Sequence, residues 1–320
     1  MNTQTTNKSL NKIIDELIIL FRKKEFNFLI EKAKDKIKEF PESFELYNLI
    51  GITFAEIKNI KQSIKYYKKA LIVNPKNFIS DFYLGSLYHD NGDLLNALKH
   101  YKKSTNLNPK YINAWFNLGV AYYENNNSLE AINSYKKVIT IDPKHANALY
   151  NLGYIYHELL NYDQSLMYYK LAIRINPGFY YSYSNLAKVF MDKGDYKNSL
   201  KYYELFLEKN PNDVKILNDV GALFVRLNHY EKSLIYFRRA LKINPESIET
   251  KYNIASVFID TGRYEQAKTI LNKIIEEQPN NFYAYSKLGE IFCNLDDFYE
   301  GIKYFHKAIR ISKNNQNLHS

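Results

Sequence analysis

A row of asparagines is the feature of this sequence best suited to binding another molecule. The row recurs at intervals of 34 residues or twice that, and its members are Asn117, Asn151, Asn185 and Asn253. A side-chain amide offers both a hydrogen-bond donor and an acceptor, so a regular row of amides can bind the backbone of an extended peptide without reading its sequence. We call these residues the asparagine row and treat them as a candidate peptide-backbone-binding site. The alternative is that asparagine recurs there because it is common throughout the chain.

A second row, the acidic row, stands seven residues after the asparagine places. Its members are Glu56, Asp90, Glu124, Glu158, Asp192 and Asp260. Seven residues are close to two helical turns, so both rows would share one helix face. The carboxylates would lie in the last turn of their helices, where the helix dipole disfavours negative charge by about 0.3–1 kcal/mol each. Because acidic residues recur there in spite of this cost, we expect them to bind a basic segment of a ligand. The alternative is that they pair with lysines of neighbouring repeats.

Aromatic residues beside the asparagine places are candidate anchors for a ligand. The candidates are Phe82, Phe116, Tyr150 and Tyr154. Large aromatic side chains often dominate binding energy at protein interfaces. The alternative is that aromatic residues stand at these places only because they are abundant throughout the chain, which has 30 tyrosines and 19 phenylalanines.

Catalytic signatures are absent from the sequence. It has no glycine-rich phosphate loop, no nucleophile elbow and no histidine pair at helical metal-binding spacing. The single cysteine, Cys293, cannot form an internal disulfide or a cysteine zinc site. We therefore expect no enzyme activity, no cofactor and no metal.

The prolines indicate which elements carry these rows. All eight lie 34 residues apart, at Pro41, Pro75, Pro109, Pro143, Pro177, Pro211, Pro245 and Pro279. A strict period of this length indicates one supersecondary unit per repeat. With Phe44 as the first place, eight repeats fill residues 44–315.

Each repeat has the pattern of a helical hairpin. The eighth place is always small and the eleventh always aromatic, as in Gly51 and Phe54, and a second small residue at the twentieth place precedes a large one four residues later. Spacings of three and four put these side chains on one face of a helix. Residues that favour helix N-caps precede the helices at Ser43, Asn59, Asn77, Asp93, Asn127, Asn161, Asp195, Asp213 and Ser247.

The pattern resembles the tetratricopeptide repeat (TPR) family, through Trp115-Phe116-Asn117-Leu118-Gly119 with Tyr122, Ala131, Tyr135 and Pro143. The resemblance implies an all-α, right-handed α-solenoid of antiparallel helix hairpins whose concave groove is made mainly of first helices. The asparagine row is similar to the peptide-gripping row of O-GlcNAc transferases, although the repeats leave no room for a transferase domain. Lys251, Leu271 and Ile274 depart from the family pattern and put the packing of their repeat in doubt.

The remaining segments complete the domain prediction. Residues 10–43 end at an in-phase proline but lack the small-then-aromatic signature, so we expect a degenerate hairpin that caps the repeats. Residues 1–9 and 316–320 are expected to be disordered. The last helix has Phe298, Ile302, Phe305 and Ile309 at stripe spacing with no further helix to cover them, which invites self-association.

Together these patterns predict a non-enzymatic scaffold or adaptor that binds an extended, basic peptide segment of a partner protein. The net charge of +10 and the outward lysines of the second helices leave an alternative, the binding of a polyanion such as RNA or an anionic membrane surface on the convex face. Nucleic acid is nevertheless disfavoured as a partner, because no two-residue base-reading code recurs in the repeats. No apolar run is long enough to span a membrane, and we expect a cytoplasmic protein.

Overall fold

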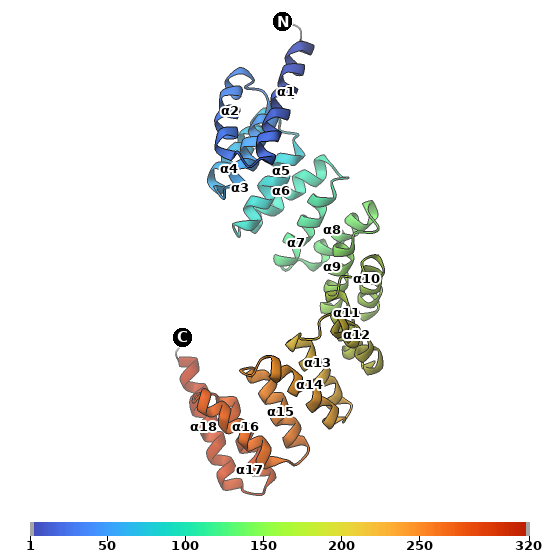
Figure 1. The fold of residues 1–320 in the computed structure, drawn as a ribbon, viewed down its shortest axis with the longest axis vertical. Coiled ribbons are helices and arrows are strands. Elements are labelled where there is room, and N and C mark those ends of the chain that lie inside the picture. Colours follow the sequence, from blue (N-terminus) through green and yellow to red (C-terminus); the bar gives the residue numbers. More distant parts are fainter. Residues whose placement is uncertain (1–2, 318–320) are drawn as a thin grey trace. The chain divides into compact units, whose positions relative to one another are not determined.

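The computed structural model describes the backbone of residues 3–317 and the side chains of residues 9–313. Over this range all regular secondary structure is α-helical (Figure 1). The chain divides between Leu160 and Asn161 into two compact units. The first unit contains α1 (Thr3–Arg22), α2 (Phe26–Glu39), α3 (Phe44–Glu56), α4 (Ile60–Val73), α5 (Phe78–Asp90), α6 (Leu94–Leu107), α7 (Ile112–Glu124), α8 (Ser128–Ile141) and α9 (Ala146–Glu158). The second unit contains α10 (Tyr162–Ile175), α11 (Tyr181–Asp192), α12 (Tyr196–Lys209), α13 (Val214–Arg226), α14 (Tyr230–Ile243), α15 (Ile248–Asp260), α16 (Tyr264–Glu277), α17 (Phe282–Asn294) and α18 (Phe298–Asn317).

The helices keep the phase of the prolines. The first helices of the repeats begin at the first place of the predicted frame, except α11, which begins one residue late. Its preceding residue, Tyr180, has helical backbone angles and offers no side-chain cap. The predicted all-α solenoid of antiparallel helical hairpins is thereby confirmed.

The predicted N-caps are also confirmed. Each of the nine side chains accepts a hydrogen bond from a backbone N–H in the first turn of its helix, as Asp213 does from Ile216. A cap of this kind typically contributes about 1 kcal/mol. The helix starts are therefore determined locally by the sequence.

The small eighth place allows the two helices of a hairpin to approach closely. A Cβ atom at Gly85 would lie 2.6 Å from the ring of Tyr101, and one at Gly221 would lie 2.3 Å from the ring of Phe237. Both distances are shorter than any van der Waals contact, so a side chain at these glycines would force the hairpin apart. The sequence prediction for this place is confirmed.

The turn inside each hairpin contains one residue in the left-handed backbone conformation. Nine such turns occur within residues 3–317, at Lys24, Lys58, Gly92, Asn126, Leu160, Gly194, Asn228, Gly262 and Asp296. Their spacing is again 34 residues. Because Lys24 belongs to this series, the hairpin of α1 and α2 keeps the same phase as the repeats that follow it.

The hairpin of α1 and α2 covers the exposed side of the first repeat. Leu17, Leu29 and Ile30 form one buried cluster with Ile50 and Phe54 of α3. Helix α1 begins at Thr3 and α18 continues to Asn317. The disorder expected for residues 1–9 and 316–320 stays a prediction. Residues 1–2 and 318–320 lie outside the described range.

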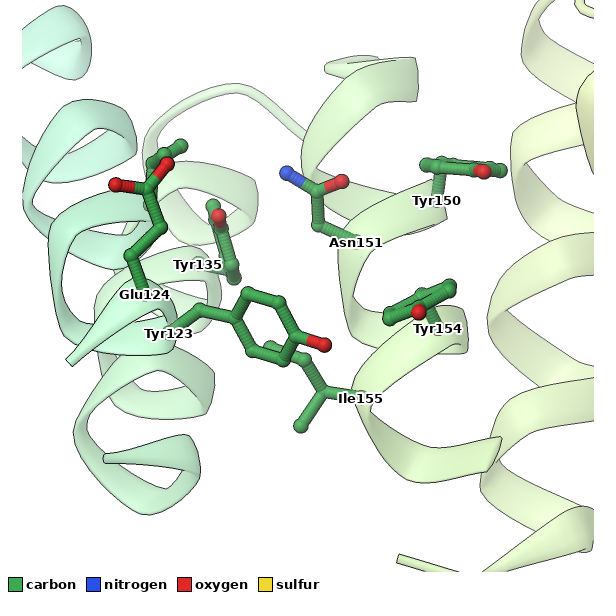
Figure 2. A pocket seen from close by; sticks show the side chains of 8 residues that line it. Tyr123, Glu124, Tyr135, Tyr150, Asn151, Tyr154 and Ile155 are labelled. Carbon is green, nitrogen blue, oxygen red and sulfur yellow. The ribbon is translucent and has the colours of Figure 1, made fainter. Parts of the chain in front are cut away.

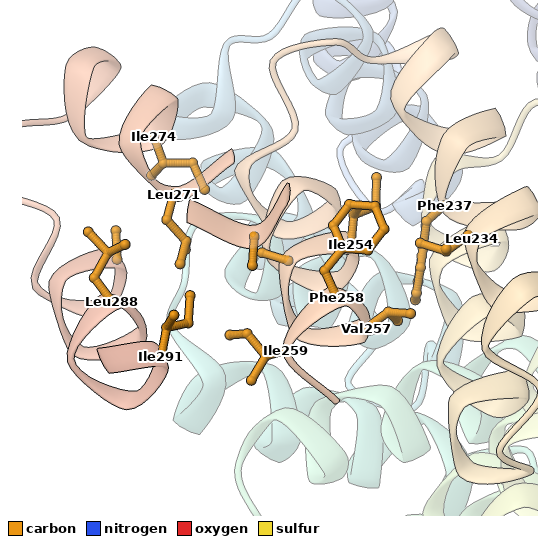
Figure 3. Packing of buried hydrophobic residues seen from close by; sticks show 13 residues of the cluster. Leu234, Phe237, Ile254, Val257, Phe258, Ile259, Leu271, Ile274, Leu288 and Ile291 are labelled. Atoms are coloured by element: carbon orange, nitrogen blue, oxygen red, sulfur yellow. The ribbon is translucent and has the colours of Figure 1, made fainter. Parts of the chain in front are cut away.

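The repeat that departs most from the family pattern has a buried aliphatic core. Leu271 and Ile274 are fully buried in a cluster with Leu288 and Ile291 of α17 (Figure 3). Lys251, the third departure, pairs with Glu277 at 2.7 Å. Aliphatic side chains and an ion pair thus take the place of the usual aromatic contacts.

Candidate functional site

The asparagine row lies on the first helices, with every member half-buried. In the first unit, Asn117 Nδ2 donates to the hydroxyl of Tyr101 at 3.4 Å. Asn151 likewise hydrogen-bonds to the hydroxyl of Tyr135. Both tyrosines are buried on the second helix of the preceding repeat. The amides therefore hold neighbouring repeats together and keep only part of their hydrogen-bonding capacity for a ligand.

This structural role was missed in the sequence analysis, although the signal was present. A tyrosine stands sixteen residues before Asn117 and before Asn151.

In the second unit Asp219 takes the asparagine place, and burial raises the pKa of its carboxyl. The two other predicted amides, Asn185 and Asn253, lie on α11 and α15 of that unit.

All six members of the acidic row are exposed. Two of them are held by a side chain from the preceding repeat, and neither partner is a lysine. Oε2 of Glu124 lies 2.7 Å from Nε2 of His89, and Oε2 of Glu158 accepts a hydrogen bond of 2.7 Å from the hydroxyl of Tyr123. These contacts orient the carboxylates but leave them at the surface.

Three further members keep their carboxylates open to solvent. In the part of the chain that the structure describes, no hydrogen bond or ion pair reaches Glu56, Asp90 or Asp260. The last predicted member, Asp192, is exposed at the end of α11. Each unit therefore retains exposed carboxylates at the ends of its first helices.

A pocket of about 300 Å³ lies between α7 and α9 (Figure 2). Its lining includes Asn151, Glu124, Tyr150 and Tyr154, which belong to all three groups of predicted site residues. Val120 and Ile155 add apolar surface, and the ring of Tyr123 meets that of Tyr154 edge to face at 5.8 Å. This first-unit pocket is the candidate site.

The other two predicted aromatic residues lie in different surroundings. Phe82 is only 9% exposed and packs against Tyr101 and Tyr111, so it is a core residue rather than a ligand-facing one. Phe116 is half-buried between Tyr135 and His145.

Lysines of the second helices are paired with aromatic rings of the next repeat. The ring follows its lysine by twenty residues in each of these lysine–ring pairs, which are Lys34–Phe54, Lys68–Tyr88, Lys102–Tyr122, Lys136–Tyr156 and Lys170–Phe190, with Nζ 5.1–5.9 Å from the ring centroid. Such cation–π contacts contribute about 0.5–1 kcal/mol at exposed sites. Part of the basic surface therefore has a structural function, although the sequence pattern predicted only an outward-facing basic face.

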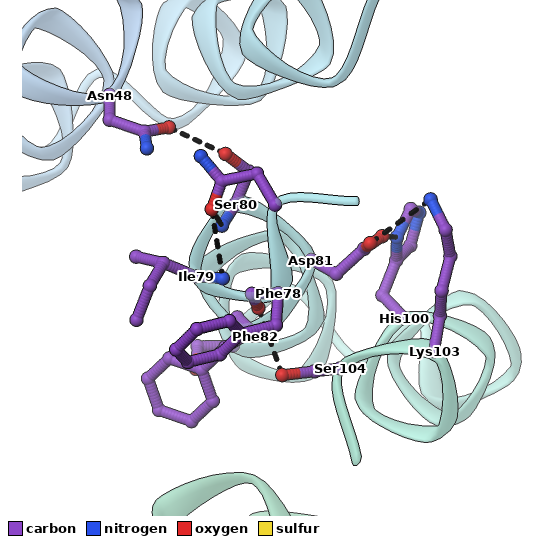
Figure 4. Close-up of polar contacts among 11 residues, drawn as sticks. Asn48, Phe78, Ile79, Ser80, Asp81, Phe82, His100, Lys103 and Ser104 are labelled. Carbon is purple, nitrogen blue, oxygen red and sulfur yellow. Dashed lines mark hydrogen bonds and ion pairs between the residues drawn. The ribbon is translucent and has the colours of Figure 1, made fainter. Parts of the chain in front are cut away.

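A buried carboxylate in the second repeat was also missed. Asp81 is fully buried and accepts from Nδ1 of His100 at 2.9 Å, while Nζ of Lys103 lies 3.0 Å away (Figure 4). Beside it, the hydroxyl of Ser80 donates to Asn48 of the preceding repeat at 2.6 Å. Lys103, expected on the outer basic face, thus neutralises a buried charge.

Family comparisons agree with the repeat frame derived from the helices. A TPR repeat model matches residues 85–126 and 129–159, and further tetratricopeptide repeat models match 44–77, 146–179, 184–248, 226–291 and 282–315. The chain belongs to the tetratricopeptide repeat family. Among curated proteins, none matches its sequence.

Solved structures that are similar to this TPR chain have the same fold. A crystal structure of MamA protein is 28% identical, with a TM-score of 0.51, and the match covers 55% of this chain and 96% of that one. YrrB, described as a TPR protein with an unusual peptide-binding site, is 19% identical with a TM-score of 0.52, covering 58% and 96%. The C-terminal part of a TPR repeat-containing protein from Cytophaga hutchinsonii is 16% identical with a TM-score of 0.65, covering 75% and 99%.

Within residues 3–317 of this TPR protein, each helix is too short or too polar to cross a bilayer. Among the side chains of residues 9–313, no three histidine, cysteine, aspartate or glutamate residues gather in a way that could hold a metal ion.

Proposed function

We propose that the chain is a non-enzymatic scaffold that holds an extended, basic segment of a partner protein along its first helices. The TPR family supports a protein-interaction scaffold in general, and the finer assignment is ours. The observation that carries it is the pocket between α7 and α9, where an amide, a carboxylate and two tyrosines selected from separate sequence patterns line the same space. A cytoplasmic location is part of this proposal.

The proposed ligand is bound through its backbone and its positive charges. The carbonyl oxygens of Asn117 and Asn151 would accept from backbone N–H groups, because their amide nitrogens already contact tyrosine hydroxyls. The exposed acidic row would attract lysine or arginine side chains of the same segment. Asn185 and Asn253 would have the corresponding role in the second unit. The description of YrrB as having a peptide-binding site supports this kind of ligand.

The test is capture of partner proteins from a native lysate by the wild type and by the triple variant Asn117→Ala, Asn151→Ala, Asn185→Ala. We expect the triple variant to capture at least about tenfold less, since each lost hydrogen bond contributes about 1 kcal/mol. The double variant Tyr101→Phe, Tyr135→Phe is the control for the first unit, because it breaks the internal hydrogen bonds of Asn117 and Asn151 but keeps both amides. Equal loss in both variants would refute direct binding by the amides.

The second candidate function is binding of a polyanion by the basic second-helix face. It is favoured by a hollow of about 580 Å³ lined by Lys102, Lys136, Lys137 and Trp115. The lysine–ring pairs count against it, because they give Lys102 and Lys136 another role. Polyanion binding requires retention on RNA or on anionic vesicles that falls steeply with salt. No retention on either at low salt would exclude this function.

A further inference from the structure

The tyrosines of the first-unit pocket present ring faces in different directions. Tyr123 and Tyr154 are nearly perpendicular, with an interplanar angle of 86°. Tyr150 stands one helical turn before Tyr154 on α9, so both project from the same side of that helix (Figure 2). The hydroxyl of Tyr123 is anchored to Glu158, which fixes the orientation of its ring. The pocket therefore has prearranged aromatic walls.

The charge of the pocket is negative and is not neutralised by its lining. Apart from tyrosines, Glu124 is the one ionisable residue that lines the pocket. No lysine or arginine is among the lining residues. Its Oε2 is bonded to His89, whereas no hydrogen bond from the described residues reaches Oε1. The side chain of Glu124 is 48% exposed, so that oxygen can accept from a ligand.

Aromatic walls beside a carboxylate favour an arginine side chain over other occupants. Ring faces attract cations, and the planar guanidinium stacks on them while its N–H groups donate to a carboxylate. A lysine ammonium is more strongly hydrated and presents no plane for stacking. The aliphatic stem of arginine would lie against Val120 and Ile155, and the volume of about 300 Å³ accommodates the whole side chain.

We propose that this pocket is an aromatic cage that binds one arginine side chain of the partner segment, between Tyr123, Tyr150 and Tyr154 with Glu124 as the counter-charge. The inference rests on the proposed function, because the arginine belongs to the segment that lies along the first helices. It goes further in assigning one residue type of the partner to one site on this chain.

The test uses four synthetic nonapeptides of glycine and serine that differ only at the central residue, which is arginine, citrulline, lysine or leucine. Dissociation constants for the full chain are measured by NMR titration. Citrulline has the shape of arginine without its charge. We expect arginine to bind about tenfold tighter than citrulline and about threefold or more tighter than lysine.

Variants of the chain locate the effect. Glu124→Gln and Tyr154→Leu should each reduce the preference for arginine over citrulline to about twofold or less, whereas Tyr154→Phe should keep it, because the ring face remains. Glu42→Gln, an equal charge change at an exposed residue outside the pocket, is the matched control and should leave the preference unchanged.

The outcomes separate this inference from the proposed function. Equal binding of all four peptides would overturn the cage and leave backbone binding by the asparagine row standing. No binding of any peptide would overturn both. Lysine or leucine binding as tightly as arginine would overturn the assignment of arginine, and an arginine preference that survives Glu124→Gln and Tyr154→Leu would overturn the location.

Discussion

The buried tyrosines of the second helices occupy the same place in successive repeats but differ in whether their hydroxyl has a hydrogen-bond partner. Tyr101 and Tyr135 are contacted by the amides of the next repeat. The hydroxyl of Tyr67 is buried without a hydrogen bond among the described residues, because Tyr83 occupies the asparagine place and stacks on its ring at 5.3 Å. The same residue type therefore has opposite energetic consequences in successive repeats.

Replacing these tyrosines by phenylalanine should reveal the difference. Tyr67→Phe removes a buried polar group that lacks a partner, so we expect the free energy of unfolding to stay unchanged or rise by up to about 1 kcal/mol. Tyr135→Phe leaves the amide of Asn151 without its partner and should lower the free energy of unfolding by about 1 kcal/mol. Urea unfolding of both variants checks this, and a larger loss for Tyr67→Phe than for Tyr135→Phe would contradict it.

Asp219 should make the stability of the second unit depend on pH. Burial raises the pKa of Asp219 in the folded protein above its pKa in the unfolded chain. The protonated carboxyl therefore contributes its full stability at a pH below the unfolded pKa. This contribution is lost as the pH rises through the folded pKa. Asp219→Asn removes the buried charge and should raise the free energy of unfolding by about 1 kcal/mol at pH 7. The gain should disappear near pH 4, close to the ordinary pKa of aspartate. An equal gain at both pH values in thermal unfolding would argue against this assignment.

The sequence predicted which residues carry the candidate site but not what they contact. The asparagine, acidic and aromatic places follow from the period, because a residue type that recurs in one position is visible without coordinates. The contacts of Glu124 with His89 and of Glu158 with Tyr123 join residues 35 apart in neighbouring repeats. Since one such bond uses a histidine and the other a tyrosine, no recurring pair of residue types reveals them.

At the scale of the helices and turns, prediction was most complete. The caps and the close glycine contacts depend on residues only a few positions apart or on the other helix of the same hairpin, and both were confirmed. The left-handed turn residues were missed because six of the nine in the described range are not glycine. Their identity varies while the backbone conformation is kept by the helices on either side.

The turns offer a test with effects of opposite sign. Lys58 has φ of 60° and Gly92 has φ of 78° at the same place of successive repeats. Lys58→Gly should stabilise the chain by about 0.5–1 kcal/mol, because a side chain disfavours this conformation, and Gly92→Ala should destabilise it by about 1 kcal/mol. A Cβ atom at Gly92 would meet nothing within 4 Å, so a clash does not complicate the comparison. Denaturant midpoints that shift in the same direction for both variants would contradict this explanation.

At the scale of the whole molecule, the C-terminal end differs from the N-terminal one. The hairpin of α1 and α2 covers the first repeat, whereas α18 presents Phe298, Ile302 and Ile309 with 59%, 54% and 52% of their surface exposed. Phe305, the fourth residue of the predicted stripe, is half-buried and packs near Gly289. Self-association through this helix remains a prediction.

Light scattering at increasing protein concentration tests that prediction. Apolar surface that is left uncovered favours association, so the apparent mass should rise with concentration above that of a monomer. The double variant Ile302→Lys, Ile309→Lys should restore the monomer mass of 37.8 kDa at every concentration. A wild-type chain that is monomeric throughout would exclude self-association.

The lysine–ring pairs have a consequence for how the array melts. Each pair joins a second helix to the first helix of the following repeat, so its attraction belongs to the coupling between neighbours rather than to any hairpin alone. In a one-dimensional array, this coupling term determines cooperativity. Substituting glutamine at Lys68 and Lys102 should therefore leave helix content intact at low temperature but broaden the thermal transition monitored by circular dichroism, since adjoining repeats would begin to unfold independently.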